Sequence, residues 1–452
     1  MSGVIDVAVV GAGPAGLAAA LAAGELGCEV TLIDAGSGLG GQQYRPGLLF
    51  PGSGPARRAT EQLPPHLARI RQVRLVRHLA ATSAGPATRG DDGVVTLWVG
   101  GLEGGAETTV EVRTVVLATG ASELVLPFPG WDLPGVTTAG AVQALLTSQG
   151  VTVGQRVLVG GAGPQLLPVA ASLAEAGVHV VAVLEATPAP ADLPQAAGLA
   201  AFPGPLPEAT GHAALLARLG VPVRTGYAVV ACQGADRVER AVLAELDEDW
   251  RPVPGSRREE AVDAVHVSFG FSPALELPRA LGCAEVPHAS RPTAAVACDS
   301  DQATSVPGVF AAGQVTGAGG ANEAELEGYL AGTSAAHHLG RLDPAAYVER
   351  TRTLRARLED VRRHAARLDA AYPLPPGWLD WPEAGTVVCR CQETPWSAIA
   401  TAVAAGARTV PAVQAATGCG TGYCQGRVCG PALQYAVSAY AMSADSGRPP
   451  AQ

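Results

Sequence analysis

Five of the nine cysteines in this 452-residue chain fall in one short stretch near its C-terminal end. They are Cys389, Cys391, Cys419, Cys424 and Cys429, whereas the other four are scattered and are expected to be buried and inert. In an intracellular enzyme, clustered cysteines favour a metal or redox centre over disulfide bonds. Four thiolates brought together by a Cys-x-Cys loop and a later loop suit a 2Fe–2S cluster. Zinc is the competing metal, but the paired Cys-x-x-Cys sequences of its structural sites are absent.

The N-terminal segment carries residues suited to binding a phosphate-linked nucleotide. A short apolar stretch at 5–10 leads into a turn formed by Gly11, Ala12, Gly13, Pro14, Ala15 and Gly16. Gly11 would allow a tight turn, Gly13 would let the backbone approach a pyrophosphate, and Gly16 would let the following helix pack closely on the strand. The start of that helix would offer free N–H groups to the phosphates. Asp34 ends the next apolar strand and is placed to accept hydrogen bonds from a ribose.

Three later pairs of residues indicate which nucleotide binds there. Each pair lies at or after the end of an apolar strand: Gly41 and Gln42, Thr119 and Gly120, and Gly313 and Gln314. This order resembles the flavoproteins with two dinucleotide-binding domains, whose first nucleotide fold holds FAD and is completed by a segment late in the chain. In such proteins an acid that binds the ribityl chain usually occupies the position of Gln314, but a Gln amide can also hydrogen-bond to a hydroxyl. The resemblance implies FAD as the cofactor.

A second segment of the same plan begins at residue 156. Its apolar strand enters a turn with Gly161 and Gly163, a helix follows, and the next strand ends at Glu185. Leu166 stands where the third glycine of the motif is expected, so the helix and strand cannot pack there in the same way. Glu185 would suit a ribose diol and would repel a 2′-phosphate, which disfavours NADP. Whether this fold takes NAD, takes ATP or ADP, or has lost its nucleotide stays open.

Composition and charge limit the partners and the location. The net charge of −10 argues against nucleic acid or an anionic membrane surface as a partner. Apolar residues make up 48% of the chain and charged residues 16%, as expected of a large α/β protein with buried parallel strands. The longest apolar runs are interrupted well before a membrane-spanning length, and the N-terminal strand enters the glycine turn without a signal-peptide pattern. We therefore expect a cytoplasmic protein with no membrane insertion.

The order of these segments predicts an α/β protein with two Rossmann-like dinucleotide-binding folds and a small C-terminal cysteine-rich domain. Residues 43–77 are expected to form a loop and a helix over the flavin. The expected parts are an FAD-binding domain at 1–134 and 267–345, a second dinucleotide-binding domain at 135–266, a charged helix and proline-rich linker at 346–386, a 2Fe–2S domain at 387–440 and a tail at 441–452.

Several motifs together resemble one family over nearly the whole chain. They are GGQQYR at 40–45, PFPGWDLPGVTTAGA at 127–141, the second glycine turn, and the terminal CRC and CQGRVC. The family is the FAD-binding α subunit of amine and imino-acid dehydrogenases, such as opine oxidase, hydroxyproline dehydrogenase and hydrogen cyanide synthase. The resemblance implies that a separate FAD-dependent β subunit oxidises the C–N bond while this chain passes on electrons. A further candidate partner that it implies is a small ferredoxin-like subunit.

The C-terminal module by itself resembles the bacterioferritin-associated-ferredoxin-like 2Fe–2S domain. Its Cys-x-Cys pair and a later cysteine match Cys389, Cys391 and Cys424, with Cys429 as the fourth ligand. The last two ligands are often closer together in that family. The wider spacing here leaves Cys419 as a rival ligand.

The expected function is that of an electron-transferring FAD/2Fe–2S subunit in a complex that oxidises the C–N bond of an amino acid, imino acid or opine. The absence of a Cys-x-x-Cys pair excludes a dithiol of the thioredoxin-reductase type, and no catalytic acid–base pair can be nominated. Two alternatives stay open: a self-sufficient NADH-dependent ferredoxin or disulfide-type reductase, and a non-catalytic scaffold that holds a nucleotide. Activity with NADH alone would favour the reductase, and a nucleotide bound without turnover would favour the scaffold.

Overall fold

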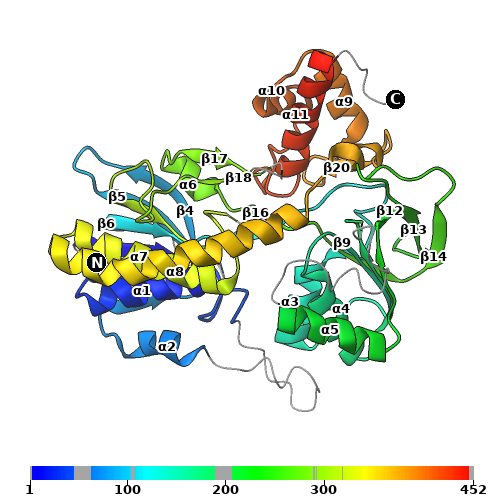
Figure 1. Cartoon of the computed structure of the whole chain (residues 1–452). Coiled ribbons are helices and arrows are strands. Elements are labelled where there is room, and N and C mark those ends of the chain that lie inside the picture. Colours follow the sequence, from blue (N-terminus) through cyan, green and yellow to red (C-terminus); the bar gives the residue numbers. More distant parts are fainter. Residues whose placement is uncertain are drawn as a thin grey trace.

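The computed structural model describes residues 3–44, 63–102, 107–188, 206–288, 291, 293–317 and 319–446. It contains two sheets side by side, each covered by helices, and a helical C-terminal module above the junction between them (Figure 1). Most of the loop predicted to cover the flavin, residues 45–62, lies outside the described residues. Within the described residues no helix combines the length and apolarity needed to cross a bilayer.

The first sheet is built around the N-terminal strand. Its strand order is β3-β2-β1-β6-β5-β4. β19 pairs in parallel with the last three residues of β6, 115–117. The strands are β1 (Ile5–Val10), β2 (Val30–Ile33), β3 (Val76–Leu79), β4 (Thr82–Arg89), β5 (Val95–Gly101), β6 (Thr108–Leu117) and β19 (Val309–Ala311). β1 pairs in parallel with both β2 and β6. Its alanine and valine residues are buried, because Val7 and Val9 pack with residues of α1 (Pro14–Glu25) and α7 (Ala321–His338), while Ala8 and Val10 pack with residues of β5, α6 (Glu276–Ala280) and β18 (Ala294–Val296).

Helices α1 (Pro14–Glu25) and α7 (Ala321–His338) pack closely against each other over this sheet. Glycines on α7 permit this contact. A Cβ at Gly328 would lie 2.1 Å from the carbonyl oxygen of Ala15, and one at Gly332 would lie 2.2 Å from that of Ala19. The small residues of both helices therefore bring the late segment of the chain onto the first turn of α1. The long helix α8 (Pro344–Ala371), capped by Asp343, lies across α7.

The second sheet repeats the parallel plan. Its strand order is β11-β10-β9-β15-β8, and a separate antiparallel sheet, β12-β13-β14, packs beside it. The strands are β8 (Val136–Thr138), β9 (Arg156–Gly161), β10 (His179–Glu185), β11 (Val223–Thr225), β12 (Tyr227–Gln233), β13 (Arg240–Glu245), β14 (Arg258–Ala261) and β15 (Ala264–Ser268). The helices are α3 (Ala139–Gln149), α4 (Leu166–Glu175) and α5 (Leu206–Arg218).

Two segments cross between the sheets side by side. They pair as the antiparallel strands β7 (Ala121–Glu123) and β16 (Phe271–Pro273). The smaller elements around the first sheet are α2 (Pro65–Ala68), η2 (Arg69–Gln72), α6 (Glu276–Ala280), β17 (Glu285–Pro287) and β18 (Ala294–Val296).

Because β1, β6 and β19 are parallel, their glycine-rich C-terminal ends lie at one edge of the first sheet, where the crossing segments begin and end.

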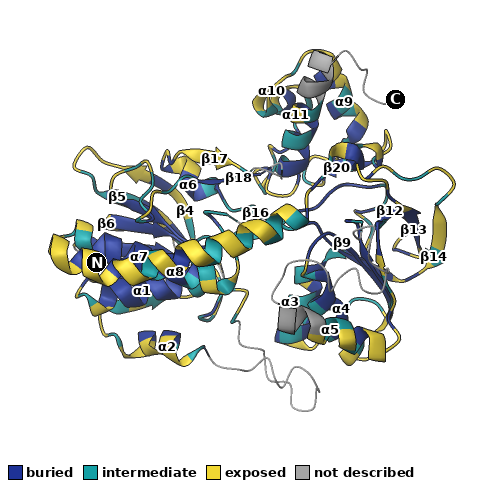
Figure 2. Ribbon diagram, viewed as in Figure 1, coloured by how far each residue is buried: buried dark blue, intermediate teal, exposed yellow. Residues whose placement is uncertain are grey.

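The chain between α8 and the C-terminal module is packed against the second sheet rather than held away from it. Trp378 and Trp381 are fully buried, and Trp381 Nε1 donates to the carbonyl oxygen of Trp250 at 2.9 Å. The buried side chains of the module and of the second sheet form one continuous core, which Figure 2 shows as dark blue on both sides of the junction. The elements are η4 (Pro376–Asp380), β20 (Val387–Cys389), β21 (Thr394–Pro395), α9 (Trp396–Ala404), α10 (Val410–Thr417) and α11 (Gly430–Ser446). The last helix thus continues past residue 440 into the predicted tail.

Candidate cofactor sites

The turn after β1 has the close contacts that its glycines were predicted to allow. Gly11 has a φ of 106°, and a Cβ there would lie 2.1 Å from the carbonyl oxygen of Ala118 at the end of β6. A Cβ at Gly16 would lie 1.7 Å from the carbonyl oxygen of Gly11. Both distances are far below van der Waals contact, so only glycine fits at these two positions. They hold α1 tightly against the ends of the two central strands.

Gly13 and Gly41 face each other across a cradle at the start of α1. A Cβ built on Gly41, whose φ is 58°, would lie 2.6 Å from the Cα of Gly13. A Cβ on Gly13 would have only the Cα of Gly41 nearby, at 4.0 Å. Pro14 occupies the first helical position and Ala15 the next, so the free N–H groups of the helix begin directly at this cradle. The bare backbone and the helix N-terminus fit the pyrophosphate of a dinucleotide.

Asp34 ties the end of β2 to the same turn. Its carboxylate accepts hydrogen bonds from the backbone N–H of Ala12 at 2.5 Å and of Gly36 at 2.6 Å. The side chain remains partly exposed. Asp34 therefore lies where an acid that binds the ribose of a dinucleotide is required.

Two of the three later predicted pairs close around this turn. Thr119 Oγ1 donates to the carbonyl oxygen of Ala274 at 3.0 Å, and the N–H of Ala274 donates to the carbonyl oxygen of Gly120 at 3.0 Å. Gly313 lies against the first turn of α1, since a Cβ there would be 2.8 Å from that of Ala15. Gln314, next to it, is partly exposed, and Gln42 lies exposed beside Gly41. The structure thus gathers the glycines and Thr119 into one site, with the two glutamines at its edge.

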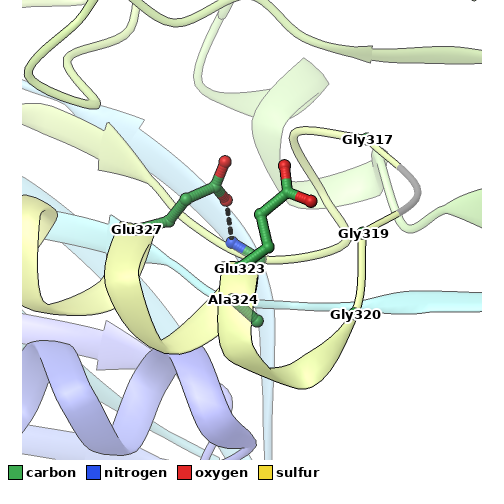
Figure 3. A pocket seen from close by; sticks show the side chains of 7 residues that line it. Gly317, Gly319, Gly320, Glu323, Ala324 and Glu327 are labelled. Atoms are coloured by element: carbon green, nitrogen blue, oxygen red, sulfur yellow. Dashed lines mark hydrogen bonds between the residues drawn. The ribbon is translucent and has the colours of Figure 1, made fainter. Parts of the chain in front are cut away.

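Two glutamates that no sequence motif pointed to, Glu323 and Glu327, line a small pocket with the glycine-rich turn that precedes α7 (Figure 3). Glu327 is buried and accepts hydrogen bonds from the N–H of Gly313 at 2.7 Å and from Thr316 Oγ1 at 2.8 Å. Arg362 of α8 donates to the same residue at 2.5 Å. Glu323, one turn earlier on α7, has a buried Oε2 without a hydrogen-bond partner among the described residues. Burial and the neighbouring Glu327 raise the pKa of Glu323 to about 7.

The turn of the second sheet differs from the first in how it uses its acid. Gly161 has a φ of 140°, and a Cβ there would lie 1.8 Å from the carbonyl oxygen of Ser268 in β15, much as one at Gly11 would meet that of Ala118. Glu185, however, is fully buried, and its carboxylate accepts hydrogen bonds from the N–H of Gly163 and of Thr187, both at 2.9 Å. Burial raises the pKa of Glu185 to about 7. One N–H of this turn is therefore occupied by a protein carboxyl group.

The five clustered cysteines come from two places in the C-terminal module: Cys389 ends β20 and Cys391 follows it, and the other three lie between α10 and α11. The Sγ atoms of Cys389, Cys419 and Cys429 lie within 4.8 Å of one another and are buried. The other two, Cys391 and Cys424, are partly exposed and interact with each other through their side chains. A hydrogen bond with Cys419, together with burial, raises the pKa of the Cys429 thiol. Soft sulfur donors converging from two loops fit an iron–sulfur cluster, whose binding would displace such protons.

Comparisons with known proteins agree with this pair of sites. A family model described as pyridine nucleotide-disulphide oxidoreductase matches residues 5–340, which include both nucleotide folds. The chain belongs to this family. A second model, the BFD-like 2Fe-2S binding domain, matches residues 387–439. The predictions of FAD and of a 2Fe–2S cluster are confirmed: the chain is an FAD-dependent oxidoreductase that carries a 2Fe–2S domain.

Individual relatives confirm the narrower family resemblance as well. An opine oxidase subunit from Rhizobium meliloti is 33% identical over 445 residues, which are 95% of this chain and 91% of the relative. Hydrogen cyanide synthase subunit HcnB from Pseudomonas aeruginosa is 30% identical over 429 residues, which are 93% of this chain and 90% of the relative. The solved structure of L-proline dehydrogenase from P. horikoshii has the same fold. It matches with a TM-score of 0.65 at 19% identity and covers 99% of this chain and 75% of that chain.

Proposed function

We propose that this chain is the electron-transferring subunit of a complex that oxidises the C–N bond of an amino acid, imino acid or opine. The observation that carries the proposal is the presence, in one chain, of a cradle for a dinucleotide and of a thiol cluster joined to the rest by a common core. Bound FAD would supply two-electron chemistry, and a 2Fe–2S cluster one-electron chemistry. The named relatives are themselves subunits, of opine oxidase and of hydrogen cyanide synthase.

In this proposal the residues of the first fold hold the flavin and those of the module hold the cluster. The FAD site consists of Gly11, Gly13, Pro14, Ala15, Gly16, Asp34, Gly41, Gln42, Thr119, Gly120, Gly313 and Gln314. Glu327 keeps the Gly313 turn in place by accepting its N–H. The substrate is oxidised on an FAD-dependent β subunit, and a small ferredoxin-like subunit is a candidate acceptor. The complex works in the cytoplasm.

The second turn favours this division of labour over a reductase that takes hydride from NADH. Gly161, Gly163 and Glu185 are the residues proposed to hold any nucleotide there. Glu185 is buried and accepts a hydrogen bond from the N–H of Gly163, so in this conformation both groups are already paired within the protein. We therefore propose that this fold holds ADP or ATP statically, or none, and that NADH reduces the chain only slowly.

Anaerobic stopped-flow reduction of the purified chain tests the proposal. Amino-acid, imino-acid and opine substrates should leave the flavin oxidised until an FAD-dependent β subunit is added. NADH alone should bleach the flavin far more slowly than catalytic rates of about ten per second. Rapid bleaching by NADH without a partner would instead establish the self-sufficient reductase, and bleaching by an amine without a partner would contradict the division of labour.

For the cluster we propose Cys389, Cys391, Cys424 and Cys429 as ligands. Cys419 is the competitor, because its thiol lies within the buried group of three. Serine at a true ligand should abolish the cluster absorbance while FAD stays bound. Cys419→Ser should retain about two irons per chain, as measured by iron analysis and visible absorbance. Loss of iron in Cys419→Ser but not in Cys429→Ser would replace Cys429 by Cys419 in the ligand set.

A further inference from the structure

Each of the two cysteine loops carries one arginine that reaches out of the C-terminal module. Arg390 lies between Cys389 and Cys391, and Arg427 lies between Cys424 and Cys429. Each arginine makes a side-chain hydrogen bond that leaves the module. Arg390 bonds to Trp131, in the core of the second sheet, and Arg427 bonds to Glu276 at the start of α6, beside the first sheet. In Figure 1, β20 and the start of α11, which flank these loops, lie at the end of the module nearest the two sheets.

The first contact joins the Cys-x-Cys loop to the segment that crosses between the sheets. The guanidinium carbon of Arg390 lies 4.0 Å from the centroid of the Trp131 ring, and its Nη2 donates to the carbonyl oxygen of Trp131 at 2.7 Å. In return, Trp131 Nε1 donates to the carbonyl oxygen of Val387 at 2.5 Å. Trp131 is buried, so this stacked and doubly hydrogen-bonded contact is partly desolvated, which strengthens it.

The second contact joins the other cysteine loop to the segment that closes the predicted flavin site. Arg427 Nε donates to Glu276 Oε1 at 2.7 Å. Glu276 begins α6, two residues after Ala274, whose backbone bonds to Thr119 and Gly120. A short path of contacts therefore runs from the ligand loop through Arg427, Glu276 and Ala274 to the end of β6.

We propose that Arg390 and Arg427 are positioning residues that fix the two ligand loops of the cluster to two different parts of the chain, the crossing segment at Trp131 and helix α6 beside the flavin site, so that the cluster is a stationary relay and not a tethered carrier. The electron-transfer part of this proposal rests on the function proposed above. For each electron that the reduced flavin loses, the oxidised cluster gains one, and no bond in the chain is made or broken. A one-electron acceptor, such as a second iron–sulfur protein, then reoxidises the cluster.

The two contacts should differ in strength. The Arg427–Glu276 pair is half-exposed, with side-chain exposures of 54% and 30%, and exposed ion pairs contribute little by themselves. The Arg390–Trp131 contact is more deeply buried and uses three interactions. We therefore expect the contact with Trp131 to hold the Cys-x-Cys loop firmly, and the ion pair with Glu276 to hold the second loop more weakly.

The test uses the full chain with both cofactors and four variants. Arg427→Glu and Glu276→Arg each break the ion pair, and the double variant restores it with the charges exchanged. Trp131→Phe keeps an aromatic face for Arg390 but removes the Nε1 donor, and it is less disruptive than alanine at this buried position. The matched control is Arg408→Met, because Arg408 Nη1 donates at 2.8 Å to Val403 within the module itself.

Two measurements distinguish how firmly the loops are held from how fast electrons pass from flavin to cluster. Hydrogen exchange of residues 387–391 and 420–429 reports how firmly the loops are held. Flash photoreduction of the flavin, followed at the visible band of the cluster, reports the transfer rate and needs neither an amine nor a partner subunit. Each charge reversal should speed exchange of the second loop and slow transfer by about fivefold, and the double variant should recover to within about twofold of the unmodified chain. Trp131→Phe should have at least the effect of one charge reversal, and Arg408→Met should have none.

The proposal is overturned if Arg427→Glu and Trp131→Phe leave both measurements unchanged, if the exchanged pair fails to recover, or if Arg408→Met has the same effect as Arg427→Glu. A different result would count against the proposed function alone. If the unmodified chain holds both cofactors but passes no electron from flavin to cluster, the electron-transfer role fails. The exchange measurements would still decide whether the two arginines fix the loops.

Discussion

The two nucleotide folds of this chain share one sequence plan but differ in what their turns leave free. In the first, α1 begins at Pro14, directly after Gly13, and Gly16 fits where any larger residue would meet the carbonyl of Gly11. In the second, α4 begins only at Leu166, with Pro164 and Gln165 between it and Gly163. The leucine is buried in the core on the helix side of that sheet. The helix of the second fold thus begins two residues later after its turn than that of the first, and a buried leucine takes the position of the third glycine.

The acids at the ends of β2 and β10, Asp34 and Glu185, also differ in how exposed they are. Asp34 bonds to the middle residue of its turn and stays partly exposed. Glu185 is one methylene longer, bonds to Gly163 and is fully buried. The first acid can still be offered to a ligand, whereas the second bonds only within the protein. Motifs that align residue by residue can thus differ in the one property that binding needs, which is a free polar group at the surface of the turn.

The largest expected contrast comes from a bulky residue at the phosphate cradle. Gly13→Val should abolish FAD binding and leave the fold intact, because a Cβ there meets only Gly41 Cα, at 4.0 Å. Gly163→Ala is the matched change in the second turn and should leave the FAD content unaltered. Flavin released on denaturation is measured against protein. Full flavin occupancy in Gly13→Val would contradict the assignment of the first turn as the site that binds the pyrophosphate of FAD.

A smaller contrast is expected at the third glycine position. Gly16→Ala should reduce both FAD content and stability, since its Cβ would lie 1.7 Å from the Gly11 carbonyl oxygen. Leu166→Ala should cost about 2–5 kcal/mol through the cavity it leaves, with no loss of FAD. Thermal midpoints and flavin content of the two variants distinguish these outcomes. Equal loss of FAD in both variants would show that the two turns are coupled and would weaken the comparison.

The smallest effect concerns the buried acid and depends on pH. Glu185 has a folded pKa of about 7 against an ordinary value of 4.5, so between these values the folded chain holds a proton that the unfolded chain has lost. Its contribution to stability therefore falls as the pH rises through this window. Glu185→Gln should remove this dependence and raise the free energy of unfolding at pH 8 by about 1–3 kcal/mol, with little change at pH 4.5.

Urea unfolding of the Glu185→Gln variant at both pH values provides the measurement. Glu175→Gln serves as its control, since that side chain is exposed on α4. A stability gain of Glu185→Gln that is equal at pH 4.5 and pH 8 would show that proton binding at Glu185 is not its cause. Asp34→Asn is the counterpart in the first fold and should lower FAD content.

The sequence by itself determined the local parts of this protein: the turn after β1, the acid that follows β2, the repeated plan of the second fold and the cysteine cluster. These depend on spacing within a strand–turn–helix unit, where backbone geometry leaves few choices. It also led to the family and to both cofactors, because each motif that carries them is a short run of neighbouring residues, although the motifs themselves are spread along the chain.

Only the tertiary structure decided which groups are buried, and by what. It buried Glu185 and left Asp34 partly exposed, placed Cys419 with Cys389 and Cys429, and joined Arg427 to Glu276 across 151 positions of sequence. It also packed the predicted linker at Trp378 into a core shared with the second sheet. The free energy of such contacts depends on which side chains exclude water together, and chain segments far apart in sequence settle that only when they pack.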